Sequence, residues 1–150
     1  MEENEEIRVE KPLGKVLALD LGDAWIGIAI SDALRMLARP LTTVKPFELE
    51  SYLKKLFSQE KILIVVVGNP ITMRGTASAQ TDKIAEQKRT LETQFPQQQW
   101  ILWDERLSSK RATSLQRELG KKHDSDRKIK EHAQAACFVL DSFLISQREF

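Results

Sequence analysis

The chain has 150 residues, a size that suits one domain with a substantial hydrophobic core. Its single cysteine, Cys137, excludes an internal disulfide and a multi-cysteine zinc site and favours a reducing compartment, so we expect a cytoplasmic protein. The formal net charge of +1 does not indicate a polyanionic partner, and no apolar run approaches the roughly 20 residues of a membrane span, so we expect no membrane association.

Charge is distributed unevenly along the chain. The first ten residues contain five Glu, and the segment ends at Pro12, so we interpret residues 1–12 as a disordered acidic tail and residues 13–150 as a single domain. Residues 105–131 hold nine Lys or Arg against five acidic residues. This basic segment would suit contact with phosphates, but the charge taken alone favours a solvated basic surface.

The first half of the domain reads as a three-stranded antiparallel meander. Apolar runs over 16–21 and 25–31, joined by the short turn 22–24, predict a hairpin. A third strand is expected over 41–44, directly after Pro40.

The rest of the chain alternates helix and strand. Helical spacing over 47–58 predicts an amphipathic helix that buries Phe47. The β-branched run 62–67, stopped by Gly68-Asn69-Pro70, predicts a central parallel strand. Further expected elements are a helix over 77–95, a strand over 100–103, a helix over 108–119, a loop over 120–126 and a helix over 129–146. We therefore predict an α/β fold, with a mixed five-stranded sheet (three antiparallel strands plus two parallel strands) flanked by helices.

Carboxylates follow two of the predicted strands. Asp20 ends the first strand, and Asp104 and Glu105 follow the strand at 100–103. If these strands are neighbours, Asp20 and Glu105 converge, and convergent carboxylates repel one another unless a cation lies between them. Oxygen ligands of this kind hold Mg²⁺ in enzymes that cleave phosphodiester bonds, although helix capping or a turn would also explain each residue.

Three segments resemble the YqgF/RuvX family in the same order. They are 19–32, with Leu19-Asp20-Leu21-Gly22; 67–76, with Val67-Gly68-Asn69-Pro70; and 104–108, with Asp104-Glu105-Arg106. Members of this family are described as Holliday junction resolvases and as pre-16S rRNA nucleases. The resemblance implies an RNase H-like fold, a Mg²⁺ or Mn²⁺ cofactor, and maturation of the 5′ end of pre-16S rRNA during ribosome biogenesis. Structured RNA and ribosomal particles would be its partners, with branched DNA as the alternative substrate.

The resemblance also assigns catalytic and metal-binding residues. The family's catalytic aspartate and glutamate fall on Asp20 and Glu105, and its third acidic position falls on His132, three residues before Ala135. On a helical wheel His132 borders the buried stripe, whereas Glu131 points toward solvent. An imidazole binds a divalent ion or relays a proton but adds no negative charge, so it favours Mn²⁺ over Mg²⁺. The alternative is a catalytically weakened module that only binds nucleic acid.

Five further residues are candidates for nucleic-acid binding: Gly68, Asn69, Arg74, Arg106 and Lys110. Each is also explained by a turn or an ordinary surface charge. The family commonly has a basic residue in the turn where this chain has Ala24-Trp25, which weakens the expected grip on substrate there. Exposed tryptophans would stack on bases, but core packing is the more economical explanation for Trp103.

Two other questions stay open at this stage. The hairpin at 17–30 also resembles the first phosphate motif of actin-like ATPases, but the chain is too short for a second lobe and has only six glycines. A resolvase that cuts two strands symmetrically would be a homodimer, whereas a monomer would favour the RNA role.

Overall fold

The structure is a computed structural model that describes residues 14–69, 79–104 and 125–148. The expected acidic tail and the expected helix over 108–119 lie outside these residues. Within the described ranges, no helix combines the length and apolarity needed to cross a membrane.

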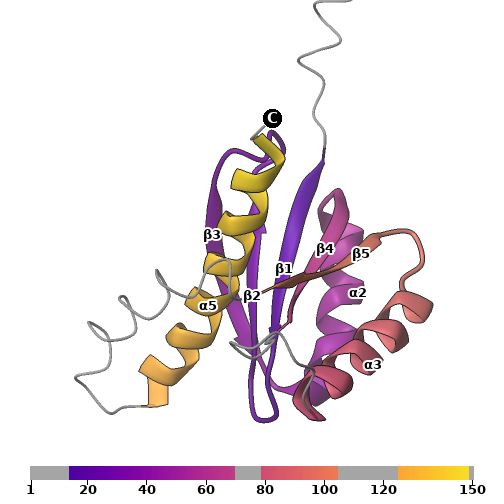
Figure 1. The fold of residues 1–150 in the computed structure, drawn as a ribbon, viewed down its shortest axis with the longest axis vertical. Coiled ribbons are helices and arrows are strands. Elements are labelled where there is room, and N and C mark those ends of the chain that lie inside the picture. Colours follow the sequence, from indigo (N-terminus) through magenta and orange to yellow (C-terminus); the bar gives the residue numbers. More distant parts are fainter. Residues whose placement is uncertain (1–13, 70–78, 105–124, 149–150) are drawn as a thin grey trace, which may run out of the picture.

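One mixed sheet of five strands forms the centre of the molecule (Figure 1). β1 (Lys15–Leu21) pairs antiparallel with β2 (Ile26–Ser31), and β2 pairs antiparallel with β3 (Ala38–Val44). β4 (Ile62–Asn69) runs parallel to β1, and β5 (Gln99–Asp104) runs parallel to β4. The strand order β3-β2-β1-β4-β5 confirms the predicted combination of a meander with two parallel strands.

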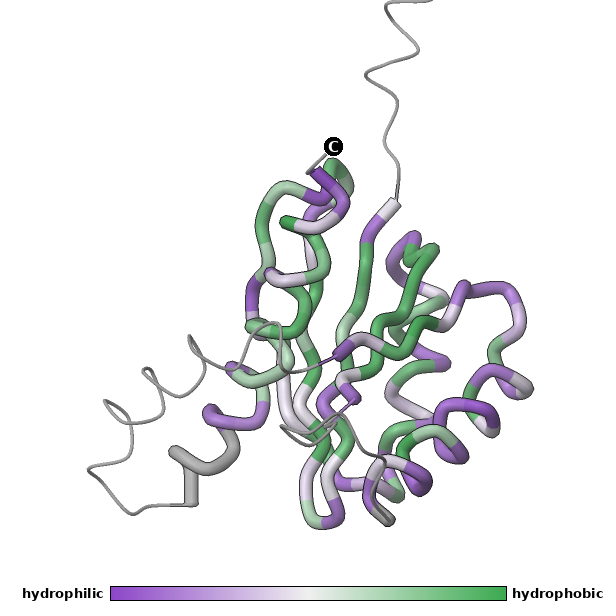
Figure 2. The backbone as a smooth tube through the Cα atoms, viewed as in Figure 1, coloured by the Kyte–Doolittle hydropathy of each residue, from purple (hydrophilic) through white to green (hydrophobic). Residues whose placement is uncertain are grey.

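Helices cover both faces of this sheet. α5 (Ser125–Arg148) lies across one face, while α2 (Leu49–Gln59) and α3 (Ala79–Gln94) lie on the other (Figure 1). A short 3₁₀ turn, η1 (Pro46–Glu48), leads from β3 into α2. β1, β2 and β4 contain the longest hydrophobic runs of the sheet, and the helices alternate hydrophobic with hydrophilic stretches (Figure 2).

Alternation along β1 divides the core into two clusters. Leu17 and Leu19 pack on the side of α2 and α3, whereas Val16 and Ala18 pack against α5. Because successive side chains of a strand point to opposite faces, the next even-numbered residue, Asp20, belongs to the α5 face. The fold thus directs the first candidate residue toward the last helix.

Three sequence expectations need correction. β3 begins at Ala38 and contains Pro40, which the sequence analysis had placed before the strand. Proline is tolerated there because β3 is an edge strand and Pro40 lies next to a register irregularity opposite Ala29. Phe47 is 80% exposed and not buried, because it lies in η1 ahead of the first turn of α2. The last helix begins at Ser125, inside the segment expected to be a loop.

Candidate active site

Asp20 lies where the buried part of β1 ends. The four residues before it are fully buried, whereas its own side chain is 23% exposed. In the hairpin it pairs with Gly27 of β2. Its carboxylate is therefore held by a central strand on the α5 face and is partly accessible there.

Gly27 brings the last helix into contact with the sheet. A Cβ atom at this position would lie 1.8 Å from the carbonyl oxygen of His132 and 2.8 Å from the backbone nitrogen of Ala133. Only a residue without a side chain permits this approach. The helix backbone consequently rests on β2 directly opposite Asp20.

His132 is the α5 residue that meets Asp20. Its Nδ1 atom lies 3.9 Å from Oδ2 of Asp20, and its side chain is 35% exposed. The predicted buried stripe of α5 is confirmed, with Ala136 and Leu140 fully buried. Glu131, expected to face solvent, is partly buried and has an interaction partner.

The carboxyl ends of β1, β4 and β5 meet at the same edge of the sheet. Asn69 ends β4 and pairs with Asp104, the last residue of β5. The Oδ1 atom of Asn69 is buried, and no hydrogen-bond donor satisfies it among the described residues. An unsatisfied buried acceptor is costly, which marks Asn69 as a position where a bound group would be stabilised.

The other predicted site residues are placed differently or are not described. Gly68 is a buried residue inside β4 and pairs with Trp103, because the strand continues to Asn69 and does not end at Val67. Glu105 follows β5 directly but lies outside the described residues. The same holds for the three predicted cationic contacts, Arg74, Arg106 and Lys110.

The spacing of the Asp20 carboxylate and the His132 imidazole is compatible with two ligands of one divalent cation. Two ligands that each lie about 2.1 Å from one ion are separated by about 3.0 Å at a right angle and by about 4.2 Å when opposite. The 3.9 Å between Asp20 Oδ2 and His132 Nδ1 falls in this range and exceeds a direct hydrogen bond. Within the described part of the chain no group of three His, Cys, Asp or Glu residues that could hold a metal ion is found, so the Asp20 carboxylate and the His132 imidazole would need a further ligand to complete a site.

The three tryptophans have different surroundings. Trp103 donates from Nε1 to Ser142 Oγ at 3.1 Å and packs edge-on against Phe143, which confirms its expected structural use. Trp100 is buried. Trp25 is partly exposed, and the Nζ atom of Lys45 lies 5.6 Å from its ring centroid. The sequence analysis missed Lys45, because its position beside Trp25 depends on strand register and not on a local motif.

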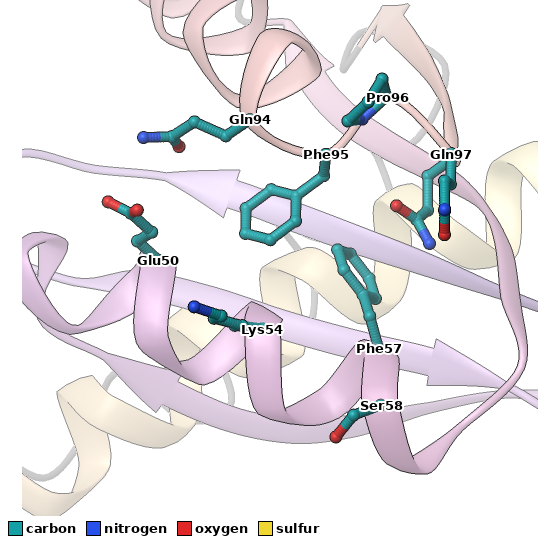
Figure 3. A pocket seen from close by; sticks show the side chains of 9 residues that line it. Glu50, Lys54, Phe57, Ser58, Gln94, Phe95, Pro96 and Gln97 are labelled. Carbon is teal, nitrogen blue, oxygen red and sulfur yellow. The ribbon is translucent and has the colours of Figure 1, made fainter.

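A separate groove of about 520 Å³ lies between α2 and the connection from α3 to β5 (Figure 3). Phe57 and Phe95 meet edge to face in it, and Glu50 and Lys54 project from α2 beside them. Gln98, which also lines it, donates to the carbonyl oxygen of Ile62 at the beginning of β4. The groove is therefore at the opposite end of the sheet from Asp20 and contains none of the predicted site residues.

The arrangement of the sheet and α5 defines the class of protein. Thermus thermophilus RuvC, solved in complex with a Holliday junction substrate, has the same fold, with a TM-score of 0.55 at 15% sequence identity over 89% of this chain and 95% of that one. A second Thermus thermophilus RuvC structure gives a TM-score of 0.50. The chain is thus an α/β protein of the RNase H-like fold.

Sequence comparisons assign the family. The family described as "RuvX: Holliday junction resolvase" matches residues 14–146. A Rubrobacter xylanophilus protein named "Putative pre-16S rRNA nuclease" is 38% identical over 83% of this chain and 88% of its own length. A protein of the same name from Amoebophilus asiaticus is 32% identical over 91% of this chain and 97% of its own length. The chain belongs to the RuvX family, a family of nucleases, which are hydrolases of phosphodiester bonds.

Proposed function

We propose that this protein is a metal-dependent nuclease that processes the 5′ end of pre-16S rRNA in the bacterial cytoplasm, in association with ribosomal particles. The observation that carries the proposal is the approach of His132 to Asp20 at the edge of an RNase H-like sheet. The names of the two relatives described above support the choice of substrate. Structured nucleic acid would lie across this edge, where β1, β4 and β5 end.

The proposed chemistry assigns a role to each residue. Asp20 and His132 would hold a divalent ion, with Glu105 as the third catalytic and metal-binding residue from the end of β5. The ion, when bound, would supply an activated water and neutralise charge on the leaving oxygen. If His132 does not bind the ion, its imidazole would instead relay a proton from the attacking water.

Histidine at this position would change the choice of metal. A site with two carboxylates and one imidazole has one negative charge fewer than a site with three carboxylates. Imidazole also suits ions of intermediate softness better than it suits Mg²⁺. We therefore expect Mn²⁺ to support cleavage better than Mg²⁺.

Cleavage of a 5′-extended 16S precursor tests the proposal. The parent protein should shorten the precursor in Mn²⁺ and lose activity in EDTA, and Asp20→Asn should abolish cleavage. Asp23→Asn is a matched control, because Asp23 lies in the adjacent turn and is engaged by Lys83 at 2.5 Å on an exposed surface. If Asp20→Asn cleaves as fast as the parent, the proposed site is wrong.

Cleavage of branched DNA is the second candidate function, favoured by the description of the family. Paired incisions in a four-way junction require two active sites related by symmetry. Size-exclusion chromatography with light scattering separates the two candidates, since a stable dimer that cuts a junction supports this function and a monomer that cuts only the RNA precursor contradicts it. Binding of RNA without cleavage in any metal would instead support a catalytically weakened module.

A further inference from the structure

A cationic and aromatic pair lies beside the site. Ile26 of β2 pairs with Val44 of β3, so the residues just outside this pair, Trp25 and Lys45, are cross-strand neighbours. The 5.6 Å between the Lys45 ammonium and the Trp25 ring centroid is within cation–π range. Lys45 is exposed, and none of the ion pairs between described residues includes it.

We propose that Trp25, Lys45 and Phe47 form a surface that binds an unpaired nucleotide of the substrate strand next to the cleavage site. The aromatic rings would stack on the base, and the ammonium of Lys45 would pair with a phosphate. This inference rests on the proposed nuclease function and adds to it a substrate feature, a single-stranded segment flanking the bond that is cut.

The surface is continuous with the candidate active site. A Cβ atom at Gly22 would lie 2.5 Å from the carbonyl oxygen of Trp25 and 3.8 Å from Cε1 of His132, so the turn that carries Trp25 borders the imidazole. A groove of about 360 Å³ between β3 and α5 adjoins the same region and is lined by residues that include Thr42 and Lys130. A strand that reaches Asp20 would therefore pass within reach of this turn.

Phe47 supplies a second exposed ring. It is two residues beyond Lys45 in η1, and with 80% of its surface accessible it is the most exposed of the large hydrophobic side chains in the described residues. A lone exposed phenylalanine has no special meaning. An exposed lysine with one aromatic side chain beside it and a second two residues further along the chain offers the groups that proteins use to bind single-stranded nucleic acids, because every base offers a face for stacking.

The nearby carboxylates are hydrogen-bonded or ion-paired to groups other than the Lys45 ammonium. Glu48 accepts the backbone N–H of Lys45 at 2.9 Å, which fixes the start of η1. Asp23 in the β1–β2 turn is paired with Lys83. Both acidic groups therefore have partners other than the Lys45 ammonium, which remains available for a phosphate.

Binding in EDTA measures the surface without cleavage. Fluorescence anisotropy would compare a short single-stranded oligoribonucleotide with a blunt duplex of the same sequence. We expect Trp25→Leu and Phe47→Ser each to weaken single-strand binding by about tenfold, with little effect on the duplex. Trp25→Phe, which keeps a ring, should retain most of the affinity.

The contribution of Lys45 is read from the salt dependence. Lys45→Gln should reduce the slope of log affinity against log salt by about 0.7, the value for one phosphate contact on a single strand, whereas Lys45→Arg should keep the slope. Lys61→Gln is the matched control, because Lys61 is also exposed but precedes β4 at the opposite end of the sheet. If Trp25→Leu does not fold, the Lys45 variants and Phe47→Ser still decide the question.

The outcomes separate this surface from the nuclease function. If Trp25→Leu, Phe47→Ser and Lys45→Gln all bind single-stranded RNA as tightly as the parent does, the proposed surface is wrong, even if the parent protein cleaves precursor RNA. Equal losses on single strand and duplex would overturn the stacking role. If the parent does not cleave the precursor but the variants selectively lose single-strand binding, the proposed nuclease function is wrong and the binding surface is supported.

Discussion

Replacement of Gly27 by alanine offers a direct test of how the fold builds the site. The added Cβ would lie 1.8 Å from the carbonyl oxygen and 2.2 Å from the carbonyl carbon of His132. An ordinary close C···O contact is at least about 3.3 Å, so α5 or β2 must move by roughly 1.5 Å. Both partners are backbone, so no side-chain rotation can relieve the clash.

The magnitude of the effect follows from this geometry. Overpacking in a core typically lowers the free energy of unfolding by about 1–3 kcal/mol. We expect Gly27→Ala to reach the upper end of this range, because the added methyl group meets the backbone of α5 and no side chain can rotate away. A helix shift of that size would also change the 3.9 Å separation of His132 and Asp20. A misplacement of about 1 Å at a reacting group can lower the rate about 100-fold.

Urea denaturation and cleavage by the folded protein measure these two effects separately. Gly14→Ala is the control, because Gly14 has a φ of +90° and an added Cβ would meet the side chain of Leu63 far from His132. It should lower stability while leaving cleavage per folded molecule unchanged. Parental stability and parental cleavage by Gly27→Ala would refute the idea that this contact sets the site.

Three further predictions concern single side chains. His132→Asp should tighten Mg²⁺ binding at least about fivefold in a calorimetric titration, because a unit charge about 4 Å away contributes about 1 kcal/mol in water and more where partly buried; unchanged binding would separate His132 from the metal site. Burial, followed by the charge of Asp141, raises the pKa of the Cys137 thiol to about 11, so iodoacetamide should react at pH 8 only when urea unfolds the chain; rapid reaction of the folded protein would contradict this burial. The pKa of Asp32 is lowered chiefly by the hydrogen bond from the backbone N–H of Leu37 at 2.8 Å. Asp32→Ala should therefore lower the free energy of unfolding by about 1–2 kcal/mol in urea denaturation at neutral pH. This difference from the parent should shrink as acid protonates Asp32, since a lowered pKa gives stability that is lost as pH falls; a difference independent of pH would contradict that reasoning.

The sequence was sufficient to predict the five strands, apart from the start of β3, and the position of Asp20. The uninterrupted apolar runs of β1 and β4 have no stable place except inside a sheet. The wheel of α5 also placed His132 toward that sheet, because the buried stripe of Ala136 and Leu140 fixes how the helix is rotated. Hydrophobic periodicity was therefore sufficient to predict most of the fold and to place His132 on the side of α5 that faces the sheet.

Features that depend on long-range register could not be predicted in this way. The pairing of Trp25 with Lys45 requires the β2–β3 register, which includes an irregularity between Ile28 and Ala29. The exposure of Phe47 depends on where a 3₁₀ turn gives way to α2, and helical spacing does not reveal this boundary. The unsatisfied Oδ1 of Asn69 likewise becomes visible only when its neighbours in three dimensions are known.

Pro40 has a consequence for how two copies of the protein would associate. It is exposed on β3, an outer strand of the sheet, and it has no amide hydrogen to offer. A strand from another molecule that approached this margin would find the row of donors interrupted, so extension of the sheet from one molecule into the next is disfavoured there. A twofold assembly able to make paired incisions would have to join its halves through helices or through the β5 side.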